Sequence, residues 1–105
     1  MTKNDFLKEG FKFFAAQDFA QAEAAFINAL ELDPEFDLAL NALTEVYNKT
    51  GNLDQALETA GKLVAIAPDD PLVHAALSRL YMQKGMIEKA EEELAISNQL
   101  SLQNK

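Results

Sequence analysis

The sequence predicts an all-α fold, an α-solenoid built from three stacked helix–turn–helix units. Two residue series repeat every 34 positions: Pro34 and Pro68 close successive units, and Ala22, Ala56 and Ala90 recur at one place within the units. Apolar residues also recur at the spacing of one helical turn. The 105 residues include four glycines and three prolines, a composition that favours helix over sheet. A fixed period of this length is typical of stacked helical repeats.

Six helices are expected, two in each unit, and capping signals mark where some of them begin. Asp18 with Gln21, and Asn52 with Gln55, have the spacing of a capping box at the start of a second helix. The expected helices are, in order, residues 3–16, 19–32, 36–50, 53–66, 71–84 and 87–100.

The turns between the two helices of a unit carry their own signals. Gly51 and Gly85 suit the left-handed residue that ends a helix. The third unit has Met86 and Lys89 where the other units have a capping pair, so its second helix should begin less firmly.

Further series share the 34-residue period, and together they resemble the signature of the tetratricopeptide repeat (TPR) family from Lys3 to Leu100. The matching residues are Phe6, Gly10, Phe13, Ala22, Phe26, Ala29 and Pro34 in the first unit, Leu40, Leu43, Tyr47, Gly51, Ala56 and Pro68 in the second, and Leu77, Tyr81, Gly85 and Ala90 in the third. Thr44 and Ser78 depart from the glycine or alanine that is usual in the family. The resemblance implies six antiparallel helices in a right-handed superhelix. It also implies one TPR domain over 1–105, with repeats at about 3–36, 37–70 and 71–104.

The resemblance further implies a concave groove, lined by the first helix of each unit, that binds a peptide or a helix of another protein. The candidate groove residues are Leu7, Phe11, Phe14, Leu38, Asn41, Ala42, Glu45, Leu72, Ala75, Arg79 and Met82. This mostly apolar set suits an amphipathic helix or an extended hydrophobic segment. Phe11 and Phe14 could instead pack inside the first unit. Glu45 and Arg79 are 34 residues apart, and we expect them to pair with each other; the alternative is that they contact the partner.

One specialised TPR groove, the carboxylate clamp of co-chaperones, does not match. The clamp holds a C-terminal carboxylate by charge-assisted hydrogen bonds from lysine, arginine and asparagine. The corresponding positions hold Leu7, Phe11, Ala42, Leu72 and Ala76, none of which can bind a carboxylate. The sequence therefore predicts a groove for a different ligand.

Charge and composition narrow the class of partner. The net charge is −8, and residues 3–36 carry seven acidic and three basic groups, so the surface should repel nucleic acid. No apolar run approaches the ~20 residues that span a bilayer, so no membrane insertion is expected. The first thirty residues lack the pattern of a secretory signal, and the chain has no cysteine. We expect a cytoplasmic protein.

No residue pattern predicts catalysis, a metal or a cofactor. His74 is the single histidine and shares its series with Phe6 and Leu40, which predicts a packed side chain. The run Glu91–Glu93 lies on consecutive helical positions, which point about 100° apart and cannot converge on one cation. We therefore expect no catalytic residue, no metal and no cofactor.

The end of the chain leaves a second interpretation open. Ser97 and Asn98 make the last helix more polar than its equivalents, whereas Met82, Met86 and Leu94 could stay uncovered and support a homodimer. The leading interpretation is a non-catalytic protein–protein interaction module that binds a peptide or amphipathic helix of a partner. The alternatives are a structural module that acts through homo-oligomerisation and a small chaperone for a secretion or assembly subunit.

Overall fold

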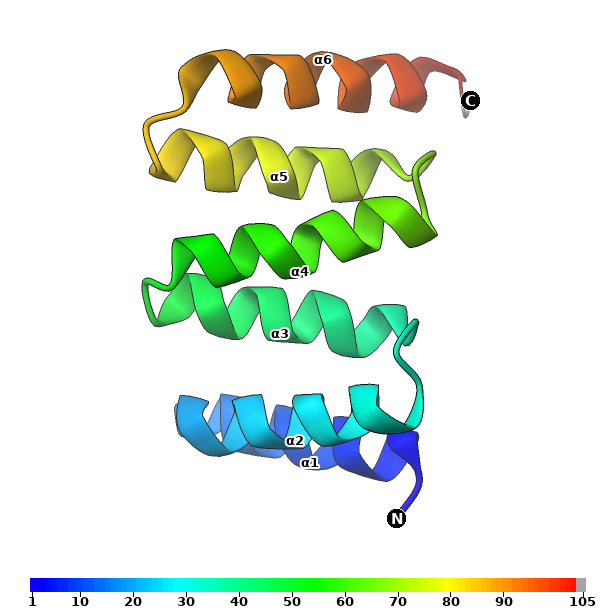
Figure 1. Cartoon of the computed structure of the whole chain (residues 1–105), viewed down its shortest axis with the longest axis vertical. Coiled ribbons are helices and arrows are strands. Elements are labelled where there is room, and N and C mark those ends of the chain that lie inside the picture. Colours follow the sequence, from blue (N-terminus) through cyan, green and yellow to red (C-terminus); the bar gives the residue numbers. More distant parts are fainter. Residues whose placement is uncertain (104–105) are drawn as a thin grey trace.

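The computed structural model describes residues 1–103 and contains six α-helices in one stack (Figure 1). They are α1 (Lys3–Ala15), α2 (Phe19–Leu32), α3 (Asp37–Lys49), α4 (Leu53–Ile66), α5 (Pro71–Gln83) and α6 (Ile87–Gln103). The two termini lie at opposite ends of the stack, which measures 39 × 29 × 20 Å. The predicted all-α solenoid is confirmed. The first five helices begin and end within one residue of the expected positions, whereas α6 continues to Gln103. The predicted end of the third repeat, residue 104, lies outside the described residues.

The helices pack as three pairs, α1 with α2, α3 with α4 and α5 with α6. Ala22, Ala56 and Ala90 are fully buried, each on the second helix of its pair. The small alanine side chain permits two antiparallel helices to approach closely. Helices α2 and α3, and likewise α4 and α5, then join one pair to the next and make the core continuous along the stack.

Gly10 makes the first pair fit together. A Cβ atom at this position would lie 2.3 Å from the ring of Phe26, which is fully buried. At the equivalent place in the second pair the smaller Ala60 faces Thr44, whose hydroxyl lies 2.7 Å from that of Thr59. The departure from the usual small residue at Thr44 is therefore accompanied by a smaller residue on the partner helix.

The capping of the helices is only partly as expected. Asp18 accepts a hydrogen bond from the backbone N–H of Gln21 at 3.3 Å, while the Gln21 side chain bonds to the Asp18 carboxylate. The expected capping box at Asn52 is wrong: the Asn52 amide donates to the Thr50 hydroxyl at 2.9 Å, so its side chain is turned away from the helix. Thr2 and Asp5 instead form a full capping box at the start of α1, which was not predicted from the sequence.

The turns inside the three pairs share a left-handed residue. Gly51 and Gly85 have φ of 78° and 82°, as predicted, and Gln17 has φ of 62° at the equivalent place in the first pair. A residue with a Cβ atom is strained in this region by about 1–2 kcal/mol relative to the right-handed one. The first turn therefore carries strain that the other two avoid.

The variant Gln17→Gly should raise the free energy of unfolding by about 1 kcal/mol, because glycine adopts positive φ without strain. Urea denaturation measures the change. Gln17→Ala keeps a Cβ atom and should show no comparable gain. Equal stability of the glycine and alanine variants would contradict the strain.

The variant Gly10→Ala should lower the free energy of unfolding by about 1–3 kcal/mol, because the added methyl group overlaps the Phe26 ring. Gly61→Ala is the matched control. A Cβ atom at Gly61 meets nothing within 4 Å, so alanine there should stabilise α4 by about 0.5–1 kcal/mol. Thermal melts of both variants test the close approach, and a neutral Gly10→Ala would refute it.

Candidate functional site

Two large apolar side chains stand out on the first helices of the second and third pairs. Leu38 on α3 and Leu72 on α5 are 34 residues apart and therefore occupy equivalent places. Leu38 is 55% exposed and Leu72 is 76% exposed. Side chains of this size stabilise a complex when a partner covers them, so the pair marks a candidate contact surface.

A cavity of about 150 Å³ lies between these two leucines. Asn41 and Ala76 contribute to its walls, and Leu63 of α4 also lines it. We call this surface, formed by Leu38, Asn41, Thr44, Leu63, Leu72, Val73 and Ala76, the first-helix groove. Three of the predicted site residues, Leu38, Asn41 and Leu72, come together here. The groove combines an apolar lining with one amide side chain that can both donate and accept hydrogen bonds.

Two carboxylates border the first-helix groove, and both are already engaged. Asp70 accepts a hydrogen bond from the backbone N–H of Leu72 at 2.9 Å, and Asp37 accepts one from Leu38 at 2.9 Å. These bonds place negative charge at the start of α5 and α3, where it complements the helix dipole. No lysine or arginine lines this cavity, so the groove itself offers no counterion to a carboxylate.

Glu45 and Arg79 line a neighbouring small cleft with Asn48 and Gln83. The expected pairing of these two residues is wrong, because among the described residues the ion pairs within 4.0 Å do not include them. An exposed pair gains at most about 1 kcal/mol, which the loss of side-chain freedom offsets. Both charges stay available on the surface.

The other predicted site residues are spread over different environments. Leu7 and Ala42 are buried in the core and have almost no surface to offer a partner. Phe11 is 48% exposed although its ring packs edge-on against Phe26, at 5.3 Å between centroids. The half-buried Phe14 packs edge-on against Phe19 at 5.5 Å. Ala75 is half-buried, and Met82 is exposed.

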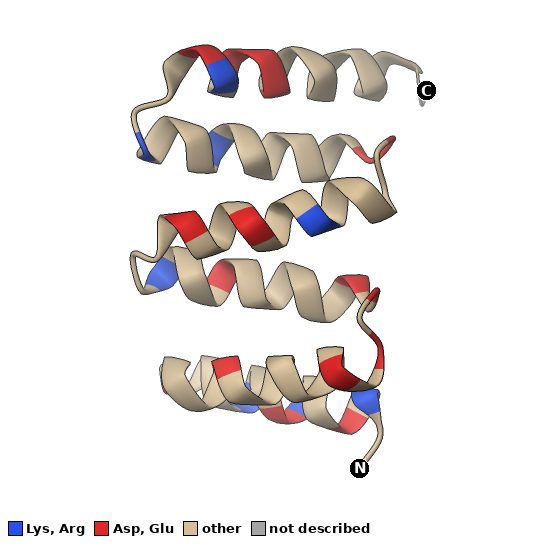
Figure 2. Cartoon of the chain, viewed as in Figure 1, with Lys and Arg blue, Asp and Glu red and all other residues tan. Residues whose placement is uncertain are grey.

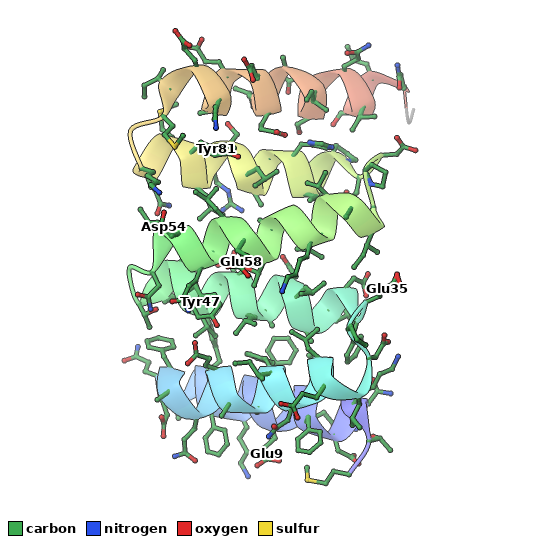
Figure 3. The ribbon with its side chains drawn as sticks, viewed as in Figure 1. Glu9, Glu35, Tyr47, Asp54, Glu58 and Tyr81 are labelled. Carbon is green, nitrogen blue, oxygen red and sulfur yellow. The ribbon has the colours of Figure 1, made fainter. Side chains whose placement is uncertain are left out.

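A larger cavity, of about 360 Å³, lies on the other side of α3, between α2 and α4. We call it the second-helix groove; its lining includes Ile27, Leu30 and Glu31 of α2, Leu40, Leu43 and Tyr47 of α3, and Glu58, Thr59 and Lys62 of α4. No pattern in the sequence predicts this groove. Burial, and the carboxylates of Glu23 and Glu58 beside it, raise the pKa of Tyr47 to about 12. Figure 3 labels Tyr47 and Glu58 on the adjacent helices α3 and α4.

His74 forms a bridge that the sequence analysis had not predicted. The imidazole is buried on α5, as expected, and its Nδ1 lies 2.7 Å from the Glu93 carboxylate of α6. Nε2 lies 2.8 Å from the backbone carbonyl oxygen of Pro68. Both partners are acceptors, so a ring that is protonated on both nitrogens, and therefore cationic, can donate a hydrogen bond to each of them.

The environment of His74 acts on its pKa in two directions. Burial lowers the pKa, whereas the hydrogen bonds to Glu93 and Pro68 and the charges of Glu93 and Asp70 raise it. The balance raises the pKa of His74 above its usual value. The bridge therefore stabilises the folded chain fully below the unfolded pKa of about 6.5 and loses that contribution as the pH rises through the folded pKa.

The variant His74→Gln should lower the free energy of unfolding more at about pH 5.5 than at about pH 9, because the ring of the parent chain loses its charge as the pH rises through the folded pKa. Urea denaturation of both proteins at both pH values measures the difference. Glu93→Gln should remove the same pH-dependent part. An equal loss at the two pH values would show that the bridge is not ionic.

The sequence and fold of this chain match known proteins. Residues 13–80 match the model of the tetratricopeptide repeat family. The chain belongs to the tetratricopeptide repeat family. It is 33% identical over 78 residues to the BBSome complex member BBS4 of Bos taurus, an alignment that covers 74% of this chain and 15% of that protein.

Several solved structures superpose closely on the chain. MamA has a TM-score of 0.94 at 20% identity, and the superposition covers 98% of this chain and 60% of the MamA chain. The Yersinia enterocolitica type III secretion translocator chaperone SycD has a TM-score of 0.86 at 17% identity, over 93% of this chain and 73% of its own. The first TPR of Spaghetti (RPAP3), bound to an HSP90 peptide, has a TM-score of 0.86 at 13% identity, over 94% of this chain and 79% of its own. At these identities the similarity shows the fold. The chain is a protein–protein interaction module of this family.

Two kinds of feature are absent from residues 1–103. No helix in this part of the chain is both long and apolar enough to cross a bilayer. The described side chains also contain no group of three or more His, Cys, Asp or Glu residues placed to hold a metal ion.

Proposed function

We propose that this chain is a non-catalytic module that binds a peptide or an amphipathic helix of a partner protein in the first-helix groove. The observation that carries the proposal is the pair of exposed leucines, Leu38 and Leu72, on either side of one cavity. Covering a leucine side chain contributes about 1.5–3 kcal/mol, so two such anchors supply much of the affinity of a short segment. Asn41 offers a polar contact that can orient the backbone of the ligand.

The proposed ligand differs from that of a carboxylate-clamp TPR. The RPAP3 structure is bound to an HSP90 peptide, whereas the clamp positions of this chain hold Leu7, Phe11, Ala42, Leu72 and Ala76. None of these side chains can donate a charge-assisted hydrogen bond to a carboxylate. The proposed ligand is therefore an apolar segment of a protein, and the proposed location of the chain is the cytoplasm. Neither a nucleic acid nor a cofactor is part of the proposal. A small chaperone that shelters a secretion or assembly subunit, as the similarity to SycD suggests, would use the same groove.

A second candidate function, self-association as a structural module, rests on α6. Leu94 is 48% exposed, although the equivalent residues Phe26 and Ala60 are fully buried by their neighbours. Ile96 and Leu102 on the same helix are also exposed. A second copy that covered this helix would form a homodimer.

A pair of double variants separates the two functions. The chain, Leu38→Glu/Leu72→Glu and Ile96→Glu/Leu102→Glu would each be used to capture proteins from a lysate of the source organism, with circular dichroism to confirm that each is folded. Mass spectrometry would identify the captured protein, and light scattering would give the oligomeric state.

Groove binding predicts that one partner is captured by the chain and by the α6 variant, and that the Leu38→Glu/Leu72→Glu variant loses at least tenfold in affinity. Loss of the partner only in the α6 variant would contradict the groove. A dimer that dissociates only in the α6 variant would support self-association instead.

A further inference from the structure

The two junctions between helix pairs share a proline but differ at two equivalent positions close to it. At the second junction His74, Glu93 and the carbonyl of Pro68 form a bridge with distances of 2.7 and 2.8 Å. The residues 34 positions earlier are Leu40, Thr59 and Pro34, and all three line the second-helix groove. The groove therefore lies at the place that the histidine bridge fills one repeat later.

The residues at the first junction cannot form an equivalent bridge. Leu40 has no polar atom on its side chain. The Thr59 hydroxyl lies 2.7 Å from the Thr44 hydroxyl and 3.1 Å from the Ala56 carbonyl oxygen of α4, so it is turned into the core. A space of about 360 Å³ lies between α2 and α4 at this junction, within the range of cavities that accept a ligand group.

The borders of this space are acidic. Glu23 and Glu31 are the charged residues of α2, and α4 carries Asp54 and Glu58 against a single basic residue, Lys62 (Figure 2). Lys62 lies 4.0 Å from Glu58, at the outer limit of an ion pair, and both side chains are largely exposed. Asp54 is paired with Lys84 of α5, whereas Glu23 lies beside Tyr47 in the wall of the cavity. Glu23, Glu31 and Glu58 against Lys62 leave two excess negative charges around an apolar floor made of Leu30, Leu40 and Leu43.

We propose that the second-helix groove is a separate docking site for a basic amphipathic segment of a protein, which inserts a large apolar side chain between α2 and α4 and places Lys or Arg against Glu31 and Glu58. The site lies on the opposite side of α3 from the first-helix groove, so a ligand here would leave Leu38 and Leu72 free. Opposite charges at the borders increase the association rate and exclude acidic segments. The apolar anchor supplies the affinity.

The test uses three synthetic helical peptides as probes: one with Phe and Leu one turn apart among lysines, one with every Lys replaced by Glu, and one basic peptide with Ala in place of Phe and Leu. Each is titrated into the isotope-labelled 105-residue chain, and amide chemical shifts locate the contact. The same titrations are made with Glu31→Lys/Glu58→Lys and with the control Glu91→Lys/Glu92→Lys. The control changes the net charge equally on exposed positions of α6.

The first peptide should shift the amides of Ile27, Glu31 and Glu58, whereas the acidic and alanine peptides should not. The Glu31→Lys/Glu58→Lys variant should bind the first peptide at least tenfold more weakly, a change of about 1.4 kcal/mol, and the α6 control should bind it as the parent chain does. An equal loss of affinity in both variants would show that the effect comes from the net charge alone, and it would overturn the proposal. Absence of binding, or shifts centred on Leu38 and Leu72, would also overturn it; the second result would leave the first-helix groove as the binding site.

Discussion

Everything in this stack depends on the close approach of two antiparallel helices at one position in each pair. Ala22, Ala56 and Ala90 have no exposed surface, and no larger side chain would let the helices come as near. One pair alone leaves an apolar face uncovered, so each pair must pack on the next. The binding surfaces follow from this arrangement, because stacked pairs leave a hollow between their first helices and another between their second helices.

The regular features of the fold could be predicted from the sequence because they repeat. The 34-residue period locates the helix pairs, and Gly51 and Gly85 locate two of the three left-handed turns. The third left-handed residue, Gln17, could not be recognised from its type, since glutamine rarely adopts positive φ. The signal that could have identified it is its position, 34 residues before Gly51.

The features that could not be predicted are those in which single residues break the repeat. The bridge from His74 to Glu93 needs two residues, 19 positions apart, that have no counterpart in the other pairs. The hydrogen bond between Thr44 and Thr59 likewise depends on side-chain rotation, which a sequence pattern does not encode. The second-helix groove lies at the junction where Leu40 and Thr59 replace the two residues of the histidine bridge. Of the predicted site residues, Leu38, Asn41 and Leu72 share a cavity, whereas Leu7 and Ala42 are buried; helical periodicity does not distinguish these two outcomes.

Site-specific photo-crosslinking tests the central claim, that a partner covers the first-helix groove, most directly. A photoreactive phenylalanine analogue would be placed singly at Leu38, Leu72 and, as a remote control, Leu102, all of which are exposed. After irradiation in cells, the account predicts that positions 38 and 72 crosslink to the same protein and that position 102 does not. Crosslinks to a partner or to a second copy from position 102 alone, with none from the groove, would contradict it.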